Sequence, residues 1–135
     1  MSQAPINSHT WLRIKLPGGR WLCYPNAAME SGRIVYDGTN QFTKKWERIE
    51  TYGGKICENI VQAVARDVLA SGLLRAEAAG YRVCLHVHDE IIAEVPDIDE
   101  YSADGLSAIM SHNPGWTLGL PLAAAGFSSY RYRKD

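Results

Sequence analysis

The 135-residue sequence predicts an α+β fold, in which antiparallel β-hairpins pack with one long helix and a second, shorter helix. Three features support this prediction: two alternating segments around a Pro-Gly-Gly turn, a long proline-free segment with helical periodicity, and a second pair of strand-like segments after it. Hydrophobic residues make up 46% and charged residues 21% of the chain, which is typical of a globular domain and excludes wholesale disorder.

The first hairpin is predicted from Trp11–Leu16 and Arg20–Tyr24, which alternate apolar and polar residues on either side of Pro17-Gly18-Gly19. We expect a third strand at Arg33–Tyr36, ending at an Asp37-Gly38 turn. The polar segment 39–50 is ambiguous.

The long helix is expected over residues 55–79, with Gly80 in the place of a C′ glycine. An apolar stripe recurs every four residues, at Ile56, Ile60, Val64 and Val68. A polar face has the same spacing, at Glu58, Gln62 and Arg66. Amide and guanidinium groups in such a row suit a nucleic-acid groove, although a solvated helix face has the same pattern.

The second hairpin is predicted from Arg82–His88 and Ile91–Pro96, folding back at or near His88-Asp89-Glu90. A second helix is expected over residues 98–112, capped by Asp97. An apolar tail follows, and it becomes basic at residues 130–134, which suits either phosphate binding or solubility.

The run 86–90, His-Val-His-Asp-Glu, is the best candidate for chemistry. A carboxylate at a hairpin tip suits a hard cation such as Mg²⁺, with Asp89 the better ligand and Glu90 beside it. A polar turn without function is the simpler alternative. A zinc site on His86 and His88, with Cys84 or His112, is a weaker reading because no motif connects these residues.

Composition narrows the class of protein further. The net charge is -1, so any polyanion must be bound by a local patch. The three cysteines are scattered, which suits a reducing compartment, and no apolar run suggests a leader or a membrane span. We therefore expect a cytoplasmic protein.

Several segments together resemble the C-terminal end of bacteriophage DNA polymerases of the polymerase I type (family A). These segments are, in order, the hairpin 13–20, residues 51–67, Gly80-Tyr81, residues 85–90, and the ending from Pro114-Gly115-Trp116 to the Arg-Tyr-Arg-Lys terminus. The resemblance covers about residues 11–134. It implies the C-terminal part of a polymerase palm domain over residues 11–135. Residues 1–10 are polar, and we expect them to be a flexible N-terminus.

The resemblance also implies roles for individual residues. Residues 87–90 match the third polymerase motif, so Asp89 would bind catalytic Mg²⁺, Glu90 would lie beside it, and His88 would lie near the primer terminus. Gln62 matches a glutamine that contacts the minor groove, and Arg66 lies one turn further along the same face. Glu58 stands where bacterial enzymes have Asn, so no DNA contact is transferred to it.

Two parts of the family's active site have no counterpart in the sequence. These are the earlier motif with the other metal-binding Asp, and the fingers helix. Lys44 and Tyr52-Gly53 have the fingers spacing, but Asn40 and Arg48 replace the expected Arg and aromatic residue. The two-metal site would therefore be completed by residues outside this chain, and we expect the chain to be inactive alone.

Three hypotheses follow. The first is one piece of a polymerase that acts on DNA primer-template and dNTP in a bacterial host cytoplasm, with a second chain facing the apolar tail, Trp11 and Trp21. The second is a non-catalytic prophage remnant or accessory DNA-binding module. The third is a small metal-dependent hydrolase built on His86, His88 and Asp89.

Overall fold

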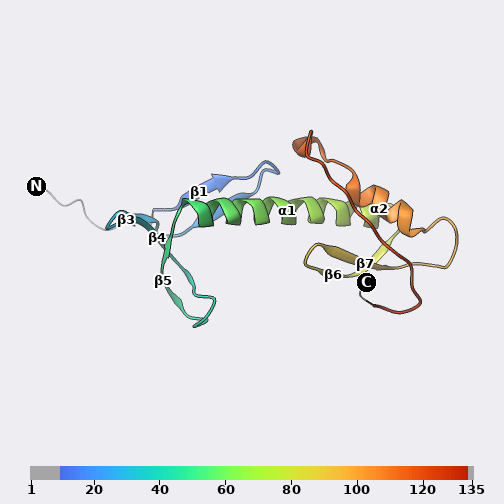
Figure 1. Ribbon diagram of the computed structural model, residues 1–135, viewed down its shortest axis with the longest axis horizontal. Coiled ribbons are helices and arrows are strands. Elements are labelled where there is room, and N and C mark those ends of the chain that lie inside the picture. Colours follow the sequence, from blue (N-terminus) through green and yellow to red (C-terminus); the bar gives the residue numbers. More distant parts are fainter. Residues whose placement is uncertain (1–9, 134–135) are drawn as a thin grey trace, which may run out of the picture. The chain divides into compact units, whose positions relative to one another are not determined.

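The computed structural model describes residues 10–133 and confirms an α+β fold. Within these residues the chain forms two units, and the boundary between Ala63 and Val64 falls inside the long helix α1 (Gly53–Ala78) (Figure 1). The expected flexible N-terminus lies outside the described residues except for Thr10, and so does Lys134 of the basic tail. Neither helix in the described part of the chain has both the length and the apolar character needed to span a bilayer.

The first unit begins with the expected hairpin. Strands β1 (Leu12–Lys15) and β2 (Trp21–Tyr24) pair antiparallel, and Gly19 adopts a φ of 90° in the turn between them, a conformation that glycine tolerates. The inner face of this hairpin packs into the core of the unit, where Leu16 and Tyr24 are buried with Val35. Figure 1 shows the hairpin running beside the first half of α1.

A three-stranded antiparallel sheet follows, with the order β3-β4-β5. Its strands are β3 (Ala28–Glu30), β4 (Arg33–Thr39) and β5 (Trp46–Thr51). The strand expected at Arg33–Tyr36 is confirmed, but the turn expected at Asp37-Gly38 is wrong, because β4 continues through both residues and pairs with β5. Ion pairs across the sheet join Arg48 to Glu30 and Asp37, at 2.7 and 3.1 Å.

The second unit contains the rest of α1 and the second hairpin, with strands β6 (Arg82–Val87) and β7 (Glu90–Glu94). The expected helix is confirmed within two residues at its start and one at its end, and Gly80 follows with a φ of 90°. The stripe residues Ile56, Ile60, Val64 and Val68 are half-buried, whereas the fully buried positions of α1 are Leu69, Gly72 and Ala76.

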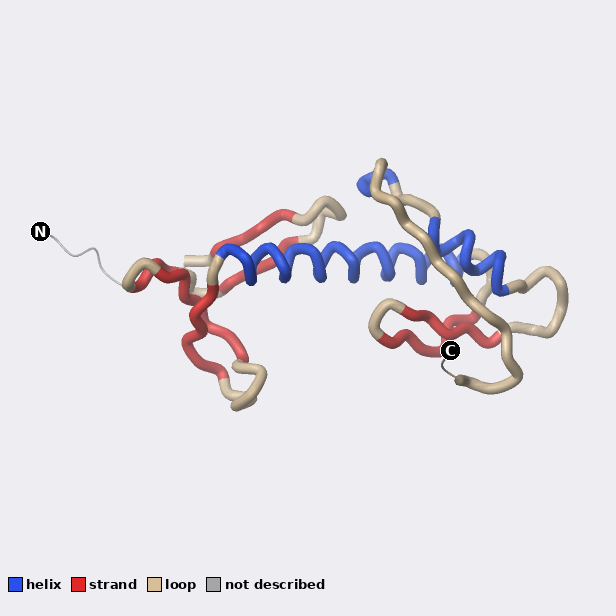
Figure 2. Tube along the Cα trace, in the orientation of Figure 1, coloured by secondary structure: helices blue, strands red, loops and turns tan. Residues whose placement is uncertain are grey.

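The second helix, α2 (Ala103–Ser111), starts later than the sequence predicts. Its N-cap is Ser102, whose hydroxyl accepts a hydrogen bond from the Gly105 backbone at 3.0 Å. Asp97 is therefore not the cap, and its carboxylate accepts a hydrogen bond from the Tyr130 hydroxyl at 3.1 Å instead. A short 3-10 turn (η1, Gly115–Thr117) leads into the tail, which Figure 2 shows as loop.

Candidate functional site

The candidate site is the two-residue turn that joins β6 to β7. Val87 and Glu90 are paired in register, so His88 and Asp89 form the turn, as the sequence predicts. His88 has a φ of 53°. A positive φ at the first turn residue is what the favoured two-residue hairpin turns require, so the backbone presents Asp89 at the tip of a paired ladder.

The carboxylates at this turn are open to solvent. Asp89 and Glu90 are both exposed, and among the described residues neither forms a hydrogen bond or ion pair through its side chain. An exposed carboxylate on a fixed backbone fits a hard cation that keeps several waters and binds through one or two carboxylates plus phosphate oxygens. Asp89 thus fits one position in a Mg²⁺ site, and no cluster of three or more His, Cys, Asp or Glu side chains that could hold a metal occurs in residues 10–133.

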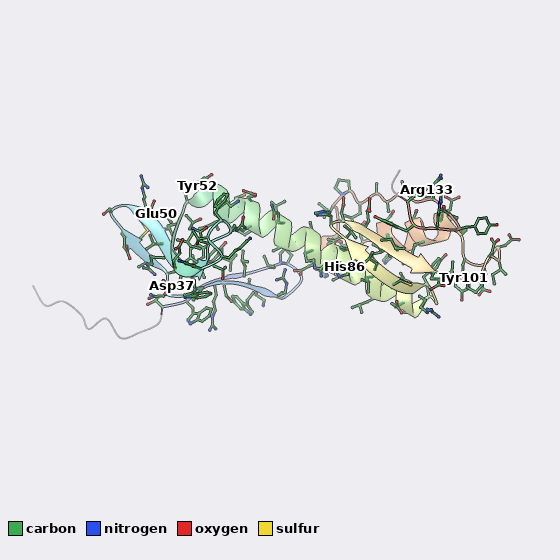
Figure 3. The ribbon with its side chains drawn as sticks, turned by 90° about the horizontal axis from the view of Figure 1, so that it is seen from below. Asp37, Glu50, Tyr52, His86, Tyr101 and Arg133 are labelled. Carbon is green, nitrogen blue, oxygen red and sulfur yellow. The ribbon has the colours of Figure 1, made fainter. Side chains whose placement is uncertain are left out.

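Arg66 connects the long helix to this hairpin within the second unit. Its Nη1 lies 3.4 Å from Nδ1 of His86, which is labelled on the hairpin in Figure 3. Because a guanidinium only donates hydrogen bonds, Nδ1 of His86 is the acceptor and the ring proton of the neutral imidazole lies on Nε2. The contact holds the Arg66 side chain at the hairpin while leaving it exposed.

The structure does not support the hypothesis of a zinc site. A β-bulge at Cys84 interrupts the pairing between Val83 and Leu85. A bulge breaks the alternation of faces, and Cys84, Leu85 and His86 are accordingly all exposed. Cys84, His86, His88 and His112 do not form a metal-binding group of three, because the described residues contain none.

Gln62 belongs to the first unit, on the exposed face of α1. Its Nε2 donates to Glu58 Oε1 at 3.1 Å, and Lys55 Nζ donates to Glu58 Oε2 at 3.0 Å. The hydrogen bond to Glu58 raises the pKa of Lys55. Lys55 thus offsets the charge of Glu58, and the second N–H of the Gln62 amide stays available to an acceptor.

The sequence did not identify two exposed cations as candidate site residues. Arg13 and Lys15 lie on β1, and their side chains face solvent beside Trp11 and Trp21. The available signal was local charge, because residues 11–24 contain three basic residues and no acidic one.

A protein called DNA polymerase, from Bacillus phage SP02, is 43% identical to this chain in an alignment 130 residues long that covers 92% of the chain. The chain is similar to part of a phage DNA polymerase. It spans 20% of the length of that relative. No protein-family model matches the sequence, and no solved structure matches it.

Proposed function

We propose that this chain is the C-terminal palm portion of a family A DNA polymerase, and that it contributes one metal ligand and a minor-groove contact to template-directed nucleotidyl transfer. The similarity to the SP02 DNA polymerase is the observation that carries this proposal. The exposed Asp89 carboxylate at the tip of the β6–β7 hairpin is consistent with it.

Each residue has a separate role in this proposal. Asp89 would hold Mg²⁺, which when bound helps to neutralise triphosphate charge and to activate a primer hydroxyl. Glu90 lies next to it at the start of β7, and His88 presents an exposed imidazole toward the primer terminus. Gln62 donates its free N–H to a minor-groove acceptor, and Arg66 contacts the DNA backbone beside the hairpin.

The remaining ligands come from another polypeptide segment. A two-metal site needs carboxylates from two places, and residues 10–133 contain no cluster that supplies them. We propose that a partner segment or second chain carries the other Asp and the groups that bind the triphosphate, and that primer-template DNA and dNTP are the substrates.

A chimera tests this proposal directly. The matched segment of the SP02 polymerase is replaced by this chain, and primer extension is measured with Mg²⁺ and all four nucleotides. We expect extension by the chimera and a loss of at least a hundredfold with Asp89→Asn, because the amide is a much poorer ligand for a hard cation. Asp99→Asn, at another exposed carboxylate of the same unit, is expected to extend normally.

The outcomes separate the alternatives. Normal extension by Asp89→Asn would show that the metal-ligand assignment is wrong. A wild-type chimera that folds without extending the primer would favour the remnant or accessory module. Adding this chain in trans to an SP02 polymerase that lacks the segment tests the second-chain arrangement independently of the fused protein.

A further inference from the structure

The outer face of the β1–β2 hairpin combines aromatic and basic side chains. Lys15 pairs in register with Trp21, and Arg13 pairs with Cys23. Trp11 and Trp21 remain 48% and 51% exposed, while the opposite face of the hairpin is half-buried or buried. The hairpin therefore has one face in the core of the first unit and one face open.

The cations on this face are positioned by the indole rings and are not neutralised. Arg13 lies 5.8 Å from the centre of the Trp11 ring, and Lys15 lies 5.9 Å from that of Trp21. Neither cation forms an ion pair with a carboxylate of the described residues. In a chain of net charge -1, residues 11–24 hold three basic residues and no acidic one, so the hairpin is a local positive patch.

The hairpin is also held firmly to the first unit. Arg20, at the turn, donates to the Ala63 carbonyl of α1 at 3.2 Å, and the Tyr24 hydroxyl accepts from Asn59 at 3.0 Å. Leu16, at the end of the inner face of the hairpin, is 2% exposed. The open face is thus presented by a fixed backbone, which reduces the entropy lost when a ligand binds.

We propose that this face binds an unpaired DNA strand, with Arg13 and Lys15 on phosphates and Trp21, assisted by Trp11, stacked on bases. A groove or face with cations beside aromatic rings is the arrangement by which proteins hold single strands without reading sequence. A cation over one face of an indole leaves the other face for a base. The choice of DNA among polyanions rests on the proposed function.

A protein partner is the competing occupant, since the sequence allowed Trp11 and Trp21 to face a second chain. The charge argues against it here, because a protein surface would need carboxylates to match two unneutralised cations, whereas a DNA strand carries a phosphate at every nucleotide. The two occupants predict different effects of hairpin substitutions on oligonucleotide binding: a loss if the face binds DNA, and no change if it faces a protein.

The first measurement is the fluorescence anisotropy of a labelled single-stranded oligonucleotide, titrated with the full 135-residue chain in about 0.1 M salt and EDTA. Arg13→Gln/Lys15→Gln is expected to weaken Kd on the order of 20-fold and to lower the log–log salt slope by about 1.4, as loss of two phosphate contacts requires. The matched control, Lys44→Gln/Lys45→Gln, removes the same charge from an exposed turn of the same unit and is expected to change Kd less than about twofold. If the double variant fails to fold, Lys15→Gln alone is expected to weaken Kd about fivefold.

The second measurement separates stacking from charge. Trp21→Leu is expected to weaken single-strand binding about fivefold or more and to leave binding of a blunt duplex unchanged, because only unpaired bases stack on an indole. Trp46→Leu, at a more exposed tryptophan of the same unit, should bind like the wild type.

Three results would overturn the proposal: no binding by the wild-type chain, equal losses in the hairpin and control variants, or hairpin variants that bind as tightly as the wild type. The last is what a protein-facing hairpin predicts. EDTA removes any metal at Asp89, so strand binding by the hairpin is measured independently of the metal site. If the chimera does not extend a primer, the measured binding of the single strand by the hairpin is unaffected. If the hairpin does not bind the strand, the primer extension measured with the chimera is unaffected.

Discussion

His88 occupies a backbone conformation that is costly for a side chain with a Cβ. Its φ of 53° lies in the left-handed region, where most residues lose about 1 kcal/mol or more relative to glycine. The imidazole is exposed and has no hydrogen bond to another described residue, so the hairpin turn, and not a contact of the side chain, holds this conformation. A strained backbone conformation at a candidate site is consistent with a functional role for this residue.

Replacing His88 with glycine should therefore separate stability from activity. We expect the free energy of unfolding of His88→Gly to be unchanged or to rise by up to about 1 kcal/mol. The relief of backbone strain offsets the greater freedom of glycine in the unfolded chain. Primer extension by the chimera should fall at least tenfold. Urea unfolding and extension rates measure the two quantities.

Lys44 supplies the matched control for this experiment, because it has a φ of 58° and lies in an exposed turn of the first unit. Lys44→Gly should change stability as His88→Gly does and leave extension intact. Equal loss of activity in both variants would contradict the role of the imidazole.

Among the elements, α2 is joined at its C-terminal end to a single arginine of α1. Arg75 donates to the carbonyl of Ile109 at 3.2 Å and to that of His112 at 2.9 Å, and these lie at the C-terminal end of α2. The last carbonyls of a helix lack partners within the helix, and a cation there also interacts favourably with the helix dipole. Gly72, one turn earlier, brings the Met110 side chain close to the α1 backbone.

Arg75→Met removes these hydrogen bonds while keeping the apolar stem. We expect the free energy of unfolding to fall by about 2 kcal/mol, as for other hydrogen bonds to a charged group. Arg82→Met is the comparison, because its ion pair with Glu94 joins exposed side chains and should contribute less than about 1 kcal/mol. Both free energies of unfolding are measured by thermal or urea unfolding. Similar decreases in both variants would show that the contact at the end of α2 stabilises the protein no more than an exposed ion pair does.

The elements differ in how well local sequence predicts them. Both hairpins and α1 follow from turn residues and periodicity, which are local signals. The strands β3 and β5 were missed because their charged residues resemble a loop until Arg48 meets Glu30 and Asp37 across the sheet. The start of α2 was misplaced because both Asp97 and Ser102 suit an N-cap, and only the tertiary contact of Asp97 with Tyr130 distinguishes them.

At the scale of the whole molecule, the candidate site could be predicted only in part. The sequence located the turn and Asp89, since a hairpin tip is a local feature. It could not give the contact between Arg66 and His86, which depends on how the hairpin and the helix pack. The roles assigned to Gln62, His88, Asp89 and Glu90 stay predictions until the variants are measured.

The isolated chain is expected not to extend a primer. Asp89 offers one exposed carboxylate, and residues 10–133 hold no cluster that would complete a two-metal site. Purified chain, Mg²⁺, primer-template and all four nucleotides test this expectation. Extension that disappears in Asp89→Asn would mean that this chain or its oligomer supplies the missing ligands, and the proposal of a partial site would be wrong.

The three exposed cysteines can each report on the solvent exposure of the element that carries them. Cys23 lies on the open face of the β1–β2 hairpin, Cys57 on α1 and Cys84 at the bulge of β6. Each free thiol lies on a different element, so thiol-reactive probes can label this chain without introducing new residues. Alkylation rates, followed by peptide mass spectrometry, then give a separate footprint of each element during strand binding and assembly with a partner, all in one unmodified protein.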